Sequence, residues 1–135
     1  MKLITWNETY SVGIEEIDAQ HQWLTDIINT LNDAVTENKS RKLLEIVLES
    51  LLQYTLSHFK TEEKLMEQYN YPDYAEHKSK HEELARKVLE WQHAFKNEDS
   101  SLTAEMLKFL KHWLENHELE TDVPLGRYLN SKGVS

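Results

Sequence analysis

Residues 58–81 read HFKTEEKLMEQYNYPDYAEHKSKH, and this stretch predicts two helices joined by a short turn. Pro72 lacks the backbone N–H that a helix interior needs, and Asp73 is a typical residue to begin the next helix. Each side of the break carries a pair of potential metal ligands four residues apart: His58 and Glu62 before it, His77 and His81 after it. Residues at this spacing share one helical face, so each pair can converge on a common ion.

The rest of the chain extends this pattern to an all-α fold, an antiparallel up-down-up-down four-helix bundle. With only 3 Gly and 2 Pro in 135 residues, few positions interrupt a helix. The helices are predicted at about residues 18–36, 40–68, 73–96 and 102–123, with Asp18 and Ser40 as N-caps. Pro124 is expected to end the last helix, before a short tail. Residues 1–17 are expected to form an ordered arm whose aromatic side chains pack on the bundle.

Composition limits the function. The formal net charge of −9 argues against binding to nucleic acid or to an anionic membrane surface, and no apolar run is long enough to span a bilayer. The chain has no cysteine, so any metal must be held by nitrogen and oxygen ligands. We expect one domain over residues 1–135, in a cytoplasmic protein that acts on small molecules.

Five of the seven histidines fall on the apolar stripes of the predicted helices: His21, His58, His77, His81 and His117. Antiparallel packing places all five at one end of the bundle. A single histidine on such a stripe is usually a core residue bonded to a neighbour. Five together predict a metal site, because each buried polar group without a partner costs about 1–3 kcal/mol. His93 and His112 lie off the stripes and are assigned no role.

Motifs along nearly the whole chain match one family in order and spacing. They are Trp6, YSVGI at 10–14, Ile17-Asp18-x2-His21, His58-Phe59-x2-Glu62-Glu63, His77-x3-His81 and Trp113-Leu114-x2-His117-x4-Asp122. On these residues the sequence resembles the hemerythrins, and most closely the bacterial single-domain kind.

The resemblance implies two Fe ions with an oxo or hydroxo bridge. It assigns His77, His81 and His117 to one iron, His21 and His58 to the other, and Glu62 and Asp122 to both as bridging ligands. The first iron is then six-coordinate, while the second is five-coordinate and keeps one open position. Dioxygen or a small anion is expected there, for oxygen carriage, storage or sensing. Leu114 and Phe59 are expected to wall the pocket, although ordinary core packing also explains them.

Glu118 departs from the family pattern, which usually has an apolar residue directly after the histidine of the fourth helix. The five residues from His117 to Asp122 do not fit a regular helix and indicate a local π-type widening. Glu118 then either reaches solvent or enters the pocket as an extra metal ligand or acid–base group. A carboxylate on the open iron would weaken ligand binding and speed autoxidation relative to a Glu118→Ile variant.

Several alternatives stay open at this stage. A ferritin-like di-iron oxidase would use Glu-x-x-His motifs, of which only Glu90-x2-His93 is present, off the stripe. A peroxidase could instead share every ligand named above. A sensor module that reports oxygen or iron to a partner would share every ligand. Histidine ligands also suit zinc, copper or nickel.

Overall fold

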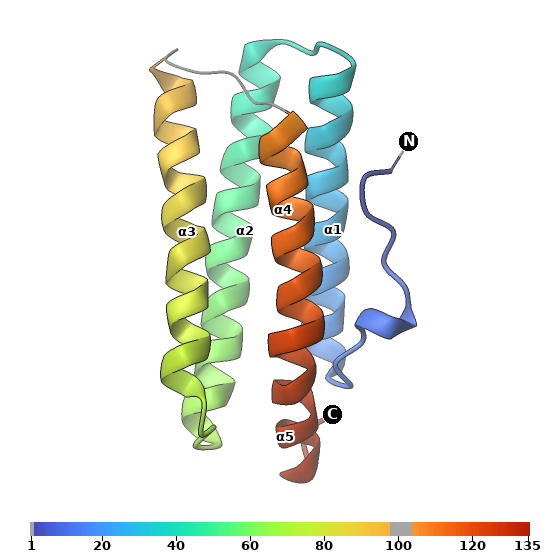
Figure 1. Ribbon diagram of the computed structural model, residues 1–135, viewed down its shortest axis with the longest axis vertical. Helices are drawn as coiled ribbons and strands as arrows, with labels where there is room; N and C mark the ends of the chain where they lie inside the picture. Colours follow the sequence, from blue (N-terminus) through green and yellow to red (C-terminus); the bar gives the residue numbers. More distant parts are fainter. Residues whose placement is uncertain (1, 98–103) are drawn as a thin grey trace.

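Four long antiparallel helices stand side by side in the computed structural model, which describes residues 2–97 and 104–135 (Figure 1). They are α1 (Glu15–Thr36), α2 (Arg41–Gln68), α3 (Tyr74–Lys96) and α4 (Ala104–Asn116). A π-helical segment, η2 (His117–Asp122), and a short helix, α5 (Val123–Ser131), continue α4. The predicted all-α, up-down-up-down bundle is confirmed. The predicted start of the fourth helix, at about residue 102, lies outside the described residues.

The residues predicted to begin the helices differ in what their side chains do. Ser40 caps α2 as predicted, because its hydroxyl accepts a hydrogen bond from the Leu43 backbone N–H at 3.2 Å. Asp73 occupies the N-cap position of α3, but its side chain makes no capping bond. The prediction of Asp18 as an N-cap was wrong, because α1 begins at Glu15.

Asp18 fastens the N-terminal arm instead of capping α1. Its carboxylate accepts hydrogen bonds from the Ser11 hydroxyl at 2.5 Å and from the Val12 backbone N–H at 2.8 Å. Further along the arm, the Asn29 side chain of α1 pairs with both backbone groups of Ile4. The Tyr10 hydroxyl, within the short 3₁₀ helix η1 (Glu8–Tyr10), donates to a carboxylate of α4 at 2.7 Å. The arm is therefore ordered against the bundle, as expected.

The fourth helix does not end at Pro124, contrary to the prediction. The π-helical segment carries the chain past His117 and Asp122 without a break, and the Val123 N–H donates to the Glu118 carbonyl five residues earlier. Pro124 then lies in the first turn of α5, where a missing N–H leaves no helical bond unmade. The predicted short tail is thus a nine-residue helix.

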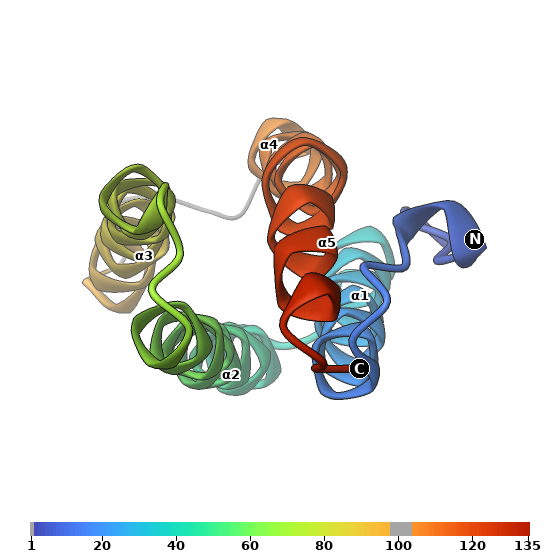
Figure 2. The ribbon, with the colours of Figure 1, turned by 90° about the horizontal axis from the view of Figure 1, so that it is seen from below.

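Apolar side chains form two separate clusters along the bundle. The larger fills most of its length between the four helices, while the smaller joins the arm, the ends of α1 and α2, and α5. The smaller cluster contains Val12, Ile14, Ile17, Met66, Leu125 and Leu129. His21 lies on α1 between Ile17 of the smaller cluster and Leu24 of the larger one. The smaller cluster therefore closes the end of the bundle beyond the histidines, and α5 lies across this end in Figure 2.

Gly126 provides a test of this end closure. A Cβ atom at this position would lie 1.8 Å from the Val12 carbonyl oxygen. The backbones of α5 and the arm therefore contact each other directly, and there is no space between them for a side chain. We expect Gly126→Ala to lower the free energy of unfolding by about 1–3 kcal/mol, the usual cost of overpacking. Urea denaturation would measure the loss. Arg127→Ala, at an exposed position of the same helix, is the control, and equal stabilities of the two variants would contradict this packing.

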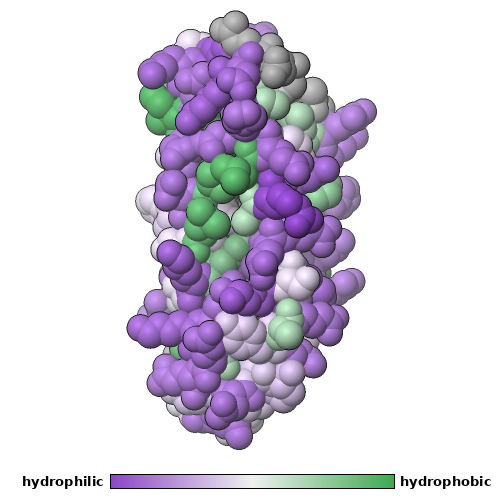
Figure 3. Space-filling view, turned by 90° about the vertical axis from the view of Figure 1, so that its left-hand side faces the viewer, coloured by the Kyte–Doolittle hydropathy of each residue, from purple (hydrophilic) through white to green (hydrophobic). Residues whose placement is uncertain are grey.

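The outer surface of the bundle is mainly hydrophilic, as amphipathic helices require. Figure 3 shows the side of the molecule on which α3 lies, where charged and polar side chains surround a group of apolar ones. Leu89 of α3 and Phe109 of α4 are among the exposed apolar residues of the chain. Within the described residues, no helix combines the length and apolar character needed to cross a membrane.

Candidate metal centre

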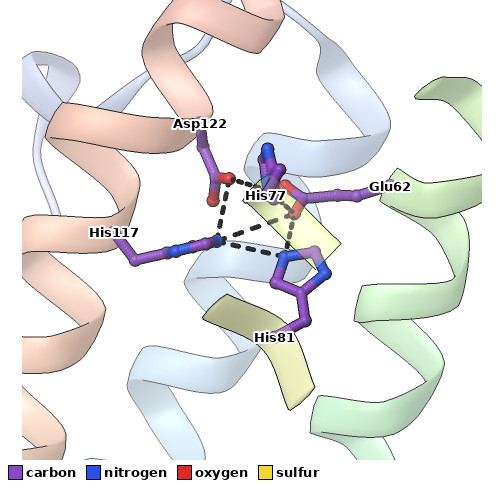
Figure 4. A group of neighbouring side chains, drawn as sticks. All are labelled: Glu62, His77, His81, His117 and Asp122. Carbon is purple, nitrogen blue, oxygen red and sulfur yellow. Dashed lines mark hydrogen bonds and ion pairs between the residues drawn. The ribbon is translucent and has the colours of Figure 1, made fainter. Parts of the chain in front are cut away.

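Seven potential ligands from all four helices meet in the interior of the bundle. Each has at most 5% of its surface exposed, and all are side chains expected from the sequence: His21, His58, Glu62, His77, His81, His117 and Asp122. Figure 4 shows five of them pointing toward one another. His93 and His112 are exposed, as predicted. Glu90 is exposed too, so the one Glu-x-x-His motif takes no part in this cluster.

The ligand atoms form two groups that share the same two carboxylates. One group contains Glu62, His77, His81, His117 and Asp122, and the other contains His21, His58, Glu62 and Asp122. Within each group the ligand atoms lie within 4.8 Å of one another. Since Glu62 and Asp122 belong to both groups, the arrangement suits two neighbouring ions bridged by two carboxylates.

Distances in the first group fit an octahedral ion. Asp122 Oδ1 lies 3.0 Å from His77 Nε2 and 3.1 Å from His117 Nε2. Glu62 Oε1 lies 3.0 Å from His81 Nε2 and 3.2 Å from His77 Nε2. Ligands at right angles on bonds of roughly 2.1 Å are separated by about 3.0 Å, whereas tetrahedral ligands are about 3.4 Å apart. His117 Nε2 lies 3.9 Å from Glu62 Oε1, which fits neither value, but five residues face this position, one more than tetrahedral zinc takes.

Several of these atoms lack hydrogen bonds although they are buried. His21 Nε2, Glu62 Oε2 and both Asp122 carboxylate oxygens have no hydrogen-bond partner. His21 Nε2 lies only 2.9 Å from Asp122 Oδ2, yet the orientation of the two groups does not allow a hydrogen bond between them. The Nε2 atoms of His81 and His117 also face each other at 3.1 Å. Converging lone pairs of this kind fit a shared cation, and the residues present therefore suit a metal.

The π-helical segment explains how His117 and Asp122 reach the same site. In a regular α-helix, residues five apart are separated by about 140° around the axis. A π-helix has a wider turn with hydrogen bonds between residues five apart, so these two side chains come onto one face. The predicted widening is confirmed. Such segments occur frequently at functional sites.

A second layer of side chains fixes the far nitrogen of two histidines. Gln20 Oε1 of α1 lies 2.6 Å from His58 Nδ1, and Glu63 Oε2 of α2 lies 3.0 Å from His81 Nδ1. A proton held on Nδ1 leaves the Nε2 lone pair free for a metal. Neither contact was predicted from the sequence, because each residue acts on a histidine of a different helix. Gln20 is adjacent to His21, and Glu63 lies beside Glu62 in the family motif.

Aromatic rings stack on two of the imidazoles, His81 again and His117. The Phe59 ring stacks on His81 with a centroid distance of 3.8 Å, and the Trp113 ring stacks on His117 at 4.4 Å. Phe59 and Leu114 both line a narrow, mostly apolar cavity of about 20 Å³ that His21, His58 and His117 border. This volume holds about one small molecule. The cavity therefore places apolar walls beside the ligand cluster.

Without metal, the cluster behaves as a buried network of ion pairs. Burial alone would raise the pKa of Asp122 and of Glu62, but the neighbouring histidines outweigh it and hold both well below their usual range. Burial alone would lower the pKa of His77, yet the Asp122 and Glu62 carboxylates close to its ring raise it to about 9. Burial lowers the pKa of His58 to about 4. In the metal-free protein, protons on the histidine nitrogens would therefore compete with a metal for the same lone pairs.

Glu118 is buried, with 2% of its surface exposed, so of the two alternatives predicted for it, exposure to solvent is excluded. Burial raises its pKa to about 8. Its Oε1 atom lies 3.6 Å from His21 Nδ1, the ring nitrogen that faces away from Glu62 and Asp122. Glu118 belongs to neither ligand group found among the described residues.

The stability of the metal-free protein and its affinity for metal are expected to change in opposite directions with pH. The His77 pKa, raised from 6.5 to about 9, stabilises the metal-free protein fully below pH 6.5, and the contribution disappears as the pH rises through about 9. We expect a loss of about 2–3 kcal/mol across this range in urea denaturation of chelator-treated protein. Metal affinity should rise over the same range, because metal displaces protons. A His77→Gln variant with an unchanged stability profile would contradict this origin.

Comparisons with known proteins agree with this geometry. The family model of the Hemerythrin HHE cation binding domain matches residues 12–125. A bacteriohemerythrin of Stenotrophomonas maltophilia (strain R551-3) is 35% identical over 117 residues, which cover 87% of this chain and 75% of that protein. The bacteriohemerythrin of Methylococcus capsulatus (strain Bath) is 31% identical over 133 residues, covering 97% of this chain and 100% of its own.

Solved structures lead to the same family. The crystal structure of a wild-type hemerythrin superposes with a TM-score of 0.89 at 29% sequence identity, covering 94% of this chain and 98% of that chain. A mutant hemerythrin superposes with a TM-score of 0.92 at 28% identity, covering 96% and 98%. With the family model matching most of its length and the donor cluster in place, the chain belongs to the hemerythrin family.

Proposed function

We propose that this chain is a non-haem di-iron protein that binds dioxygen at one open iron position. The observation that carries the proposal is the pair of ligand groups that share Glu62 and Asp122. Two bridged ions of a redox metal supply together the two electrons that bound dioxygen accepts. The names of the relatives support the same function, since two are bacteriohemerythrins and the matched family is a cation binding domain.

The proposed ligand roles follow the composition of the two groups. His77, His81 and His117 hold one iron, His21 and His58 hold the other, and both carboxylates bridge them with an oxo or hydroxo group. Three imidazoles complete a six-coordinate ion, while two leave a vacant position. The five donor residues around the first position support six-coordinate iron rather than four-coordinate zinc.

The chain's own contribution is a dry, rigid surround for that position. Leu114 and Phe59 wall the apolar cavity beside His58, which favours a small uncharged molecule and disfavours bulk water. The stacked Phe59 and Trp113 rings restrict the imidazoles that they cover. Dioxygen and small anions are the proposed ligands. A cytoplasmic location belongs to the proposal too, and the cysteine-free composition suits it.

Reversible oxygen binding tests this function. The metal-free protein would be loaded anaerobically with ferrous iron, its iron content measured, and its optical spectrum recorded before and after dioxygen is admitted. We expect two irons per chain and a charge-transfer absorption that appears with dioxygen and disappears under argon. Zinc-loaded protein is the matched control, because zinc has no redox chemistry and should give no band.

Two results would reject the function. One is a single iron per chain, which would leave the shared carboxylates without a second ion to bridge. The other is consumption of dioxygen with continued turnover of an added reductant, which would make the protein an oxidase or peroxidase instead of an oxygen-binding protein.

A further inference from the structure

Two buried polar atoms without hydrogen-bond partners face each other on the side of the His21 ring that points away from the metal ligands. His21 Nδ1 and Glu118 Oε1 are both buried, neither makes a hydrogen bond, and they lie 3.6 Å apart. One is a ring nitrogen that carries a proton when the other ring nitrogen binds a metal, and the other is a carboxylate oxygen that accepts one. Approach by about 0.7–0.9 Å would bring them to the roughly 2.7–2.9 Å of a charge-assisted hydrogen bond.

The same arrangement recurs on other histidines of the cluster. A side-chain oxygen lies within hydrogen-bond distance of the Nδ1 atoms of His58 and His81. The oxygen beside His81, in the first ligand group, belongs to a carboxylate, while the oxygen beside His58, in the second group, belongs to an amide. With Glu118 behind His21, each ligand group would contain one histidine supported by a carboxylate.

We propose that Glu118 is a positioning residue that accepts the Nδ1 proton of His21 and fixes this imidazole as an Nε2 ligand of the second metal ion. The inference rests on the proposed di-iron function and adds to it a residue that the usual apolar side chain of the family cannot replace. Its basis is the placement of the carboxylate on the far side of the ring from Asp122, which lies 2.9 Å from His21 Nε2.

In this arrangement Glu118 is not itself a metal ligand. A ligand would point its oxygen toward Glu62 and Asp122, whereas Glu118 approaches the opposite nitrogen of His21. Glu118 is also absent from the lining of the apolar cavity, where the open position would lie. The carboxylate therefore leaves the dioxygen position free and acts through the imidazole.

Two consequences follow for the metal site. A histidine with a fixed proton and orientation binds its metal more tightly, and loss of such an outer partner typically weakens metal affinity about 10–100-fold. With a pKa of about 8, Glu118 is largely protonated at neutral pH in the metal-free protein. Two bound cations would favour its ionised form, which adds a negative charge close to the irons. Since Glu118 is 2% exposed, water screens this charge little, and the charge favours the higher oxidation state of the pair.

Glu118→Gln and Glu118→Leu separate the two consequences. Glutamine keeps an oxygen that can accept the His21 proton but removes the charge, while leucine removes both. We expect glutamine to retain two irons and to shift the reduction potential to more positive values. Leucine should shift the potential likewise and lose one iron about 10–100-fold more readily to a competing chelator. Glu120→Gln, at an exposed position of the same π-helical segment, is the matched control.

Nuclear magnetic resonance of the zinc-loaded protein reads the hydrogen bond without iron chemistry. With ¹⁵N-labelled histidine, the His21 Nδ1 proton should resonate far downfield and exchange slowly with water. It should move upfield in Glu118→Gln and further, with faster exchange, in Glu118→Leu.

Three outcomes would overturn the proposal. In the first, the leucine variant keeps both metals as firmly as the unmodified protein does. In the second, the His21 proton signal is unchanged in that variant. In the third, azide binds only after Glu118 is replaced, which would show that the carboxylate itself occupied the open position. Fewer than two metals in the unmodified protein would instead reject the proposed function, so the two failures are distinguishable.

Discussion

Replacing Glu62 by glutamine is expected to abolish the binding of both metal ions at once. Glu62 is fully buried, and its oxygens approach nitrogens of both ligand groups, including His21, His77 and His81. Loss of an outer partner alone costs about 10–100-fold in metal affinity, so loss of a shared anionic ligand should cost at least about 100-fold at each position. Metal analysis after dialysis against a weak chelator would measure the effect.

The matched control for this variant is Glu67→Gln, an exposed glutamate on the same helix. It should keep the full metal content, because the Glu67 carboxylate accepts a hydrogen bond from the Tyr74 hydroxyl and belongs to neither ligand group. A Glu62→Gln protein that loses one metal and firmly keeps the other would show that the two positions do not share this carboxylate.

Removing the metal is expected to lower the midpoint of thermal unfolding by about 10–20 °C. Ligands that bind only the folded chain stabilise it, by about 4 kcal/mol at a thousandfold excess over the dissociation constant. For a domain of this size each kcal/mol shifts the midpoint by several degrees. The metal-free site also retains buried atoms without hydrogen bonds on His21, Glu62 and Asp122. Differential scanning calorimetry of loaded and chelator-treated protein would measure the shift.

Reloading with ferrous iron under anaerobic conditions should restore the higher midpoint, which controls for damage during chelation. An unfolding midpoint that is the same with and without metal would contradict the account. It would mean that the histidine–carboxylate network alone satisfies the interior of the bundle.

Local periodicity was enough to predict the fold, the five buried histidines and Glu62, whereas Asp122 was predicted from the resemblance to the hemerythrins. Each ligand histidine lies at a stripe position of an amphipathic helix, so its burial follows from helix geometry once the helices pack. The break at Pro72 places His58 and His77 at the same end of adjacent antiparallel helices. Similarly, the five-residue spacing from His117 to Asp122 could only serve one site if the helix widened, and it does.

The errors arose where a residue has two physical uses and the choice depends on tertiary contacts. Asp18 is a good capping residue, but the arm folds back and uses its carboxylate instead. Pro124 is a helix breaker in an interior, but the π-helical segment places it in the first turn of α5. Glu118 and His21 lie on helices at opposite ends of the chain, so sequence spacing alone does not reveal that their side chains approach each other.

Two irons that share Glu62 and Asp122 would be visible by anomalous diffraction at the iron absorption edge. Crystals of the iron-loaded protein should show two anomalous peaks within one site, one beside His77, His81 and His117 and the other beside His21 and His58. Both carboxylates should contact both peaks. A single peak, or two peaks without a common carboxylate, would contradict the claim.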